Sequence, residues 1–218
     1  MGKILTILFL ALATSTKAQT LRQVFTLMPD SIVPLLSKVN REDGMDYLDN
    51  DMPLDVTNKL GNITTISGEK NRYIDINTAS KAWTRLMLLP SEAGDTLICL
   101  VKTVSIDKAR DSQIHFYDKE WKPMNTSDFV NMPTVESFMT FSDSIDEEER
   151  TRLTKKIDIP LIEISANYEK SSGHENDAPT LTFKLHSPAY MNEEDCKLVT
   201  PYIKDNIKMR WNGNRFEH

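Results

Sequence analysis

The spacing of apolar residues changes near residue 62, and this change constrains the fold more than any other feature of the sequence. Before it, apolar side chains recur at helical intervals, as at Leu21 and Val24. After it, apolar and polar residues alternate, most clearly over residues 162–168 and 181–186. Alternation with a period of two is typical of antiparallel strands that expose one face. The sequence therefore predicts an α+β fold, with mainly antiparallel sheet from about residue 62 onward and a helical N-terminal segment packed against it.

The helical N-terminal segment is expected to contain three short helices. Pro29 ends the first, because proline cannot continue a helix. Asp30 can cap a second helix over residues 32–39, and a third covers residues 41–49. Beyond them, residues 96–104 are apolar on both alternating faces, which indicates a central strand buried on both sides.

Helical signals return in the second half of the chain. Residues 125–158 interrupt the strand pattern, and the charged run at 146–152 is best interpreted as the solvated side of a helix. Asn192 is a good N-cap, and the acidic residues 193–195 after it suit the first turn of a helix. The sequence thus predicts a C-terminal helix before the last strands.

The chain is expected to end in a β-hairpin. Asn212 and Gly213 lie between apolar runs, and this dipeptide favours a two-residue turn with positive φ at both positions. Such a turn would bring Phe216 beside Met209 or Trp211 on the sheet.

The first 18 residues have the pattern of a secretory signal peptide. Lys3 precedes a ten-residue apolar run at 4–13, and small residues lead to a cleavage site between Ala18 and Gln19. A run of ten residues is too short to cross a bilayer, which needs about 20. We therefore expect an exported, soluble mature chain over residues 19–218, with no transmembrane segment. A further division into 19–124, 125–158 and 159–218 is an alternative, because 62–124 and 159–217 both read as strand sets that finish with an aromatic-flanked turn.

Several stretches resemble one known family, and together they span nearly the whole mature chain. They are residues 28–31 (MPDS), 41–47 (REDGMDY), 98–103 (ICLVKT), 111–112 (DS), 116–118 (FYD), Trp121 and 211–216 (WNGNRF). This pattern is similar to an uncharacterised secreted family of Bacteroidales bacteria, domain of unknown function 3256. The resemblance implies a protein exported in a Gram-negative cell, in the periplasm or outside it. It supplies no catalytic residues.

The motifs of common enzymes and metal sites do not occur. The sequence has no G-x-S-x-G elbow, P-loop or G-x-G-x-x-G fingerprint. Its four histidines lack the paired spacing of metal ligands. We therefore assign no catalytic, cofactor-binding or metal-binding residue. The pI near 5.3 and the net charge of −6 argue against a nucleic-acid partner.

The two cysteines have alternative interpretations. Cys99 lies in the most apolar strand, where a thiol is usually inert packing. Cys196 can pack against Met191 as a hydrophobic staple at the start of the C-terminal helix. The other alternative is a disulfide between Cys99 and Cys196, which an oxidising compartment would permit.

Because the motifs of common enzymes and metal sites are missing, we predict a non-catalytic binding protein of the cell envelope. Its partner would be an envelope protein or a glycan. Tyr117, Trp121 and Trp211 are the candidate contact aromatics, and the two tryptophans beside turns are expected to be partly exposed. Ser144 lies in an Asp-Ser-apolar tripeptide and is a candidate O-glycosylation site. The alternatives are an envelope hydrolase that acts on polysaccharide with carboxylates assembled across the sheet, and a structural or stress-related periplasmic protein.

Overall fold

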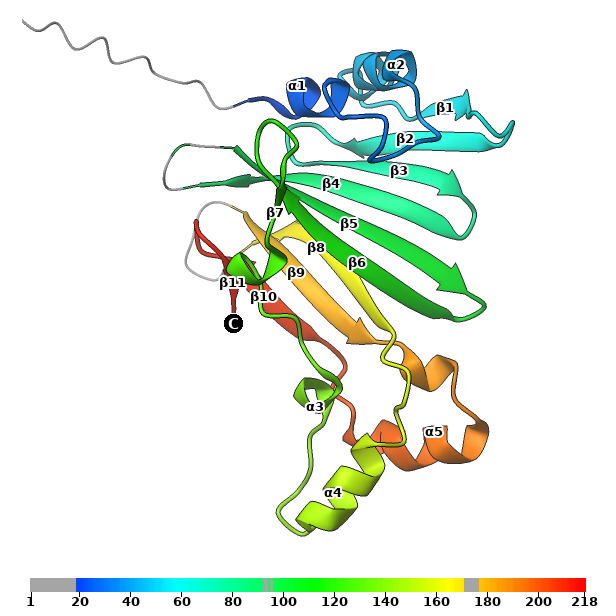
Figure 1. The fold of residues 1–218 in the computed structure, drawn as a ribbon, viewed down its shortest axis with the longest axis vertical. Coiled ribbons are helices and arrows are strands. Elements are labelled where there is room, and N and C mark those ends of the chain that lie inside the picture. The colour runs from blue at the N-terminus through cyan, green and yellow to red at the C-terminus, as the bar shows by residue number, and fades with distance from the viewer. Residues whose placement is uncertain (1–18, 92–93, 95, 171–176) are drawn as a thin grey trace, which may run out of the picture.

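The alternating segments pair into two antiparallel sheets (Figure 1). The computed structural model describes residues 19–91, 94, 96–170 and 177–218, so the predicted signal peptide lies outside the described residues. The large sheet is a meander of seven strands in chain order: β1 (Leu54–Thr57), β2 (Ile63–Glu69), β3 (Tyr73–Ala79), β4 (Ala82–Pro90), β5 (Thr96–Ile106), β6 (Ala109–Tyr117) and β7 (Pro123–Met124). The small sheet has the order β11 (Phe216–Glu217), β10 (Ile207–Trp211), β9 (Ala178–Leu185) and β8 (Ile162–Glu169). These sheets confirm the predicted α+β fold, although the first strand starts at residue 54.

Short helices precede, connect and follow the strands. They are α1 (Leu21–Thr26), α2 (Lys38–Leu48), the 3-10 turn η1 (Thr126–Asp128), α3 (Val135–Phe138), α4 (Glu147–Thr154), η2 (Ser187–Ala189), α5 (Glu193–Val199) and η3 (Thr200–Tyr202). Figure 1 shows α1 and α2 over one face of the large sheet, while α3, α4 and α5 gather beyond the ends of β8–β10. None of the helices within the described ranges is long and apolar enough to cross a membrane.

The prediction that Asp30 caps a second helix is wrong. Residues 29–36 form turns, and α2 begins after Ser37, whose hydroxyl accepts from the N–H of Asn40. Pro34 explains the difference, since proline disfavours helical geometry at the residue before it. Asp30 instead accepts a hydrogen bond from Arg41, a buried residue of α2, at 3.0 Å.

Each face of the large sheet carries its own hydrophobic core. On the outer face, Ile66, Ile74 and Leu86 pack against apolar residues of α1 and α2, such as Phe25 and Leu48. The opposite face, here called the inner face, packs against the small sheet through residues that include Met87, Cys99, Phe116, Leu181 and Phe183. This two-sided burial explains why β5 is apolar on both alternating faces from Leu97 to Val101, as predicted. The large sheet ends at residue 124 and the small one begins at 162. The division of the mature chain into 19–124, 125–158 and 159–218 stays a prediction.

The later helices follow their sequence signals. Asp146 caps α4, in which Leu153 is buried while the charged residues lie toward solvent. Asn192 caps α5 by accepting from the N–H of Asp195 at 2.9 Å. The predicted C-terminal helix is therefore confirmed.

The C-terminal hairpin differs from the predicted two-residue turn. Trp211 pairs with Phe216, so the connecting loop has four residues, Asn212 to Arg215. Within this loop only Gly213 has a positive φ, of 102°. The side chain of Asn212 closes the loop by accepting from the Arg215 N–H at 2.8 Å, a task that a tighter backbone turn would otherwise perform. The position of Phe216 beside Trp211 is confirmed, with ring centroids 5.0 Å apart.

Candidate functional site

A polar groove of about 380 Å³ lies where the inner face of the large sheet meets β8. Strands β3 and β4 supply Asp75, Asn77, Trp83 and Arg85, and β8 supplies Glu163 and Asn167; these six residues define the groove. The four residues of β3 and β4 lie on one face of the large sheet, and the two of β8 lie on one face of that strand, because side chains two residues apart on a strand point to the same side. The groove lies beside the inner-face core, where apolar side chains give way to polar ones.

Arg85 connects the two walls of the groove. Its Nε and Nη2 donate to the two oxygens of Asp75, each at 2.7 Å, while Nη1 donates to the carbonyl of Ala166 at 2.7 Å and to Oδ1 of Asn167. The guanidinium also lies over the ring of Tyr73, 3.9 Å from its centroid. Burial alone would lower the pKa of Arg85, but the bonds to Asp75 outweigh it and raise this pKa. Arg85 is therefore a permanent cation that uses four of its five N–H groups in hydrogen bonds.

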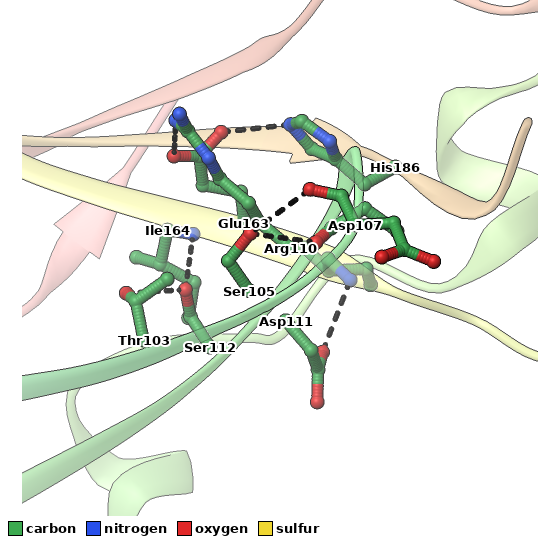
Figure 2. Close-up of polar contacts among 11 residues, drawn as sticks. Thr103, Ser105, Asp107, Arg110, Asp111, Ser112, Glu163, Ile164 and His186 are labelled. Carbon is green, nitrogen blue, oxygen red and sulfur yellow. Dashed lines mark hydrogen bonds and ion pairs between the residues drawn. The ribbon is translucent and has the colours of Figure 1, made fainter. Parts of the chain in front are cut away.

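Glu163, on the β8 wall of the groove, forms a second ion-paired cluster. Figure 2 shows Glu163 between Arg110 and His186, with Oε1 accepting from Arg110 Nη1 and Oε2 bonded to His186 Nε2, both at 2.7 Å. The Glu163 and His186 side chains are each only 14% exposed. Arg110 also lies over Trp83, 5.5 Å from the ring centroid. Both oxygens of this carboxylate are thus occupied.

Side chains of β6 bond the free backbone edge of β8. The N–H of Ile162 donates to Oδ1 of Asp111 at 3.2 Å, and the N–H of Ile164 donates to Oγ of Ser112 at 3.0 Å (Figure 2). The buried Ser112 hydroxyl also bonds the Thr103 hydroxyl at 2.8 Å. These contacts, here called the inter-sheet joint, hold β8 against the large sheet and fix the width of the groove.

The predicted exposure of the two tryptophans is wrong. Trp121 and Trp211 are each 6% exposed. The indole N–H of Trp121 donates to the carbonyl of Val24 at 3.1 Å, and that of Trp211 donates to the carbonyl of Pro90 at 2.5 Å. An indole can be buried at little cost when its N–H finds such an acceptor. Tyr117 is half-buried beside Trp121, with ring centroids 5.4 Å apart.

The cysteines are separate free thiols, so the structure does not contain the disulfide that the sequence left open. Cys99 lies in the inner-face core, where burial raises the pKa of its thiol well above the ordinary value. Cys196 lies on α5, with its sulfur 3.6 Å from the Thr200 hydroxyl. Ser144 is exposed in a turn and bonds the Ser142 hydroxyl at 2.7 Å. Its glycosylation stays a prediction.

Sequence reasoning missed the residues of the groove. Two signals were present: Arg85 interrupts an otherwise apolar strand, and Asp75 separates Ile74 from Ile76. Neither signal identifies a partner, because Arg85 and Asn167 are 82 residues apart in the chain. In the described parts of the chain, no group of three or more His, Cys, Asp or Glu side chains could hold a metal ion.

Two antiparallel sheets, joined by side chains and bordering a polar groove, define an α+β protein with a candidate ligand-binding site. The chain belongs to the family described as "Protein of unknown function (DUF3256)", whose model matches residues 13–216. The resemblance found in the sequence is thereby confirmed.

One solved structure with a similar fold is described as a domain of an uncharacterized protein from Porphyromonas gingivalis W83. The two chains are 22% identical with a TM-score of 0.72, and the match covers 90% of this chain and 96% of that one. This likeness shows the fold alone. No curated protein matches the sequence.

Proposed function

We propose that this is an exported, non-catalytic binding protein of the bacterial envelope, and that the groove between its sheets holds part of the ligand. The signal-peptide pattern of residues 1–18 supports export. The solved structure with a similar fold comes from the bacterium Porphyromonas gingivalis, which supports a bacterial setting. The partner would be a glycan or another envelope protein.

The pairing of both groove carboxylates carries the proposal. A glycosidase needs one carboxylic acid that can give up a proton and a second carboxylate that is free to attack or to activate water. Here Asp75 accepts two hydrogen bonds from Arg85, and Glu163 accepts from Arg110 and bonds His186. Carboxylate oxygens that are held by arginine guanidinium groups or by a histidine ring are poor proton donors and poor nucleophiles. This arrangement favours binding over hydrolysis.

The walls of the groove favour a preformed site. Arg85 and the inter-sheet joint connect the two sheets through four hydrogen bonds: Arg85 donates to Ala166 and Asn167, and the N–H groups of Ile162 and Ile164 donate to Asp111 and Ser112. A cavity of about 380 Å³ also falls within the roughly 300–1,000 Å³ that is usual for small-ligand sites. A rigid concave site loses little conformational entropy when it binds.

Retention of an envelope component by the immobilised mature chain tests the proposal. Residues 19–218 would be compared with Asn77→Ala, which removes an exposed amide from the groove, and with Asn206→Ala, which removes an exposed amide elsewhere. We expect a component of a Bacteroidales envelope extract to be retained by the wild type and by Asn206→Ala, and to be at least tenfold reduced with Asn77→Ala. Equal retention by all three would contradict the groove as the site.

The hydrolase alternative predicts a different result from the same material. Incubation with envelope polysaccharide would release new reducing ends, and Glu163→Gln would abolish the release. Such a result would overturn the binding proposal. If the wild type neither retains a component nor releases reducing ends, the third alternative, a structural or stress-related protein, is favoured instead.

A further inference from the structure

A row of polar and aromatic side chains crosses six strands of the large sheet on its inner face. The strand register aligns one residue from each of β1 to β6, and we call this set the polar row: Asp55, Thr65, Asn77, Trp83, Thr103 and Ser112. Neighbouring strands lie about 4.8 Å apart, so the row is roughly 24 Å long. It runs into the groove at Asn77 and Trp83.

Four of the six residues, here called the open part of the polar row, are fully or partly exposed to solvent. Thr103 and Ser112 are buried under the small sheet, at 2% and 8% exposure. Asp55 and Asn77 are exposed, and Thr65 and Trp83 are half-buried. A ligand can therefore lie across the strands β1 to β4, perpendicular to their direction, and enter the groove at Asn77 and Trp83.

We propose that the open part of the polar row and the groove bind a neutral oligosaccharide, with one sugar ring packed on Trp83. This inference rests on the proposed binding function and names its ligand class. A pyranose ring has an apolar face of C–H groups and a rim of hydroxyl groups. Trp83 and its cross-strand neighbour Asn77 place an aromatic ring and an amide side by side, which matches these two parts.

Unused hydrogen-bonding groups are available to sugar hydroxyls. Within the described residues, the amide of Asn77 and the hydroxyl of Ser165 make no side-chain hydrogen bond, and Asn167 uses only its oxygen, toward Arg85. These groups line the cavity. A hydroxyl both donates and accepts, so it can satisfy an amide and a serine hydroxyl at once.

The charges of the site favour a neutral ligand. Asp75 is paired with Arg85, and Glu163 with Arg110, so the four formal charges cancel. Asp55 adds one negative charge at the far end of the row, where its carboxylate accepts from the Thr65 hydroxyl at 2.6 Å. An acidic glycan would meet no unpaired cation among these residues and would be repelled by Asp55.

Tryptophan fluorescence provides a direct readout of binding at Trp83. The other two tryptophans, Trp121 and Trp211, are buried and hydrogen-bonded to backbone carbonyls. A ligand that packs on a half-buried indole changes its emission, so the signal on titration reports Trp83. The probes are neutral hexasaccharides of glucose, mannose and galactose, with hexagalacturonate as the acidic counterpart.

We expect at least one neutral hexasaccharide to shift the emission and to give a calorimetric dissociation constant in the micromolar range. Asn77→Ala and Trp83→Ala are expected to weaken this binding at least tenfold, with Asn206→Ala unchanged. Asn77 is exposed, so its variant tests the site even if Trp83→Ala proves unstable. Failure of every neutral probe, equal binding of hexagalacturonate, or binding that survives Asn77→Ala would each overturn the inference. If Asn77→Ala still abolishes retention of an envelope component, the binding function stands and only the ligand class is wrong.

Discussion

Replacement of Arg85 by Met should destabilise the protein far more than the same change at a matched surface arginine. The change leaves Asp75 without its partner, and removes the bond to Ala166 across the sheets. Breaking a buried pair costs about 3–5 kcal/mol. Because Arg85 and Asp75 are 22% and 20% exposed, we expect a somewhat smaller loss of about 2–4 kcal/mol in the free energy of unfolding.

Arg152 provides the control because it makes the same two-pronged contact on an exposed helix. Its Nε and Nη2 donate to the two oxygens of Glu149 at 2.6 Å, with the Arg152 side chain 53% exposed. Exposed pairs of this kind contribute about 0–1 kcal/mol, so Arg152→Met should be close to neutral.

Urea unfolding of both variants, with thermal melts alongside, measures the difference. A loss of about 2–4 kcal/mol corresponds to a fall of roughly 5–15 °C in Tm for a chain of this size. A double-mutant cycle with Asp75→Asn isolates the pair, and a coupling free energy above about 1 kcal/mol is expected. Equal effects of Arg85→Met and Arg152→Met would refute the view that Arg85 holds the sheets together.

Three further outcomes are expected. Gly213→Val should lower stability on the order of 1–3 kcal/mol, because φ is 102° there; an unchanged thermal melt would show a loop that relaxes freely. Burial raises the pKa of Tyr168 from 10.0 to about 12, so the folded state holds this proton more tightly and loses stability as the pH rises from about 10 to about 12. Tyr168→Phe should lack this component in urea midpoints taken across that range, and an identical pH dependence would contradict it. Cys196 should react with iodoacetamide in the native protein and Cys99 only after unfolding, as judged by peptide mass spectrometry; protection of both would indicate that they are bonded.

The sequence predicts the sheet well because its signals are local. Period-two alternation, the Asn192 cap and the buried strand at 96–104 each depend on residues within a few positions of one another, and all are found in the structure. The Asp30 error is also local in origin, because Pro34 disfavours helical geometry at the residue before it and the capping box of Ser37 and Asn40 starts α2 further along the chain.

The groove could not be predicted because it depends on long-range register. Asn77, Trp83 and Thr103 become neighbours only when β3, β4 and β5 pair, and a shift of one residue would turn them to the other face. The burial of the tryptophans has the same cause. Trp121 and Trp211 find their acceptors 97 and 121 residues away, so nothing near them in the sequence reveals that their polar atoms are satisfied.

The side chains at the edge of β8 also bear on whether copies of this protein remain separate. An unpaired strand edge is a template on which another chain can add a strand, and natural sheets protect such edges. Asp111 and Ser112 occupy the N–H groups of Ile162 and Ile164, and Arg85 occupies the carbonyl of Ala166. The edge is therefore closed by three side chains instead of by a neighbouring strand. Loss of Asp111 would expose a backbone donor at the edge of β8, and the first consequence would be self-association of an otherwise folded protein.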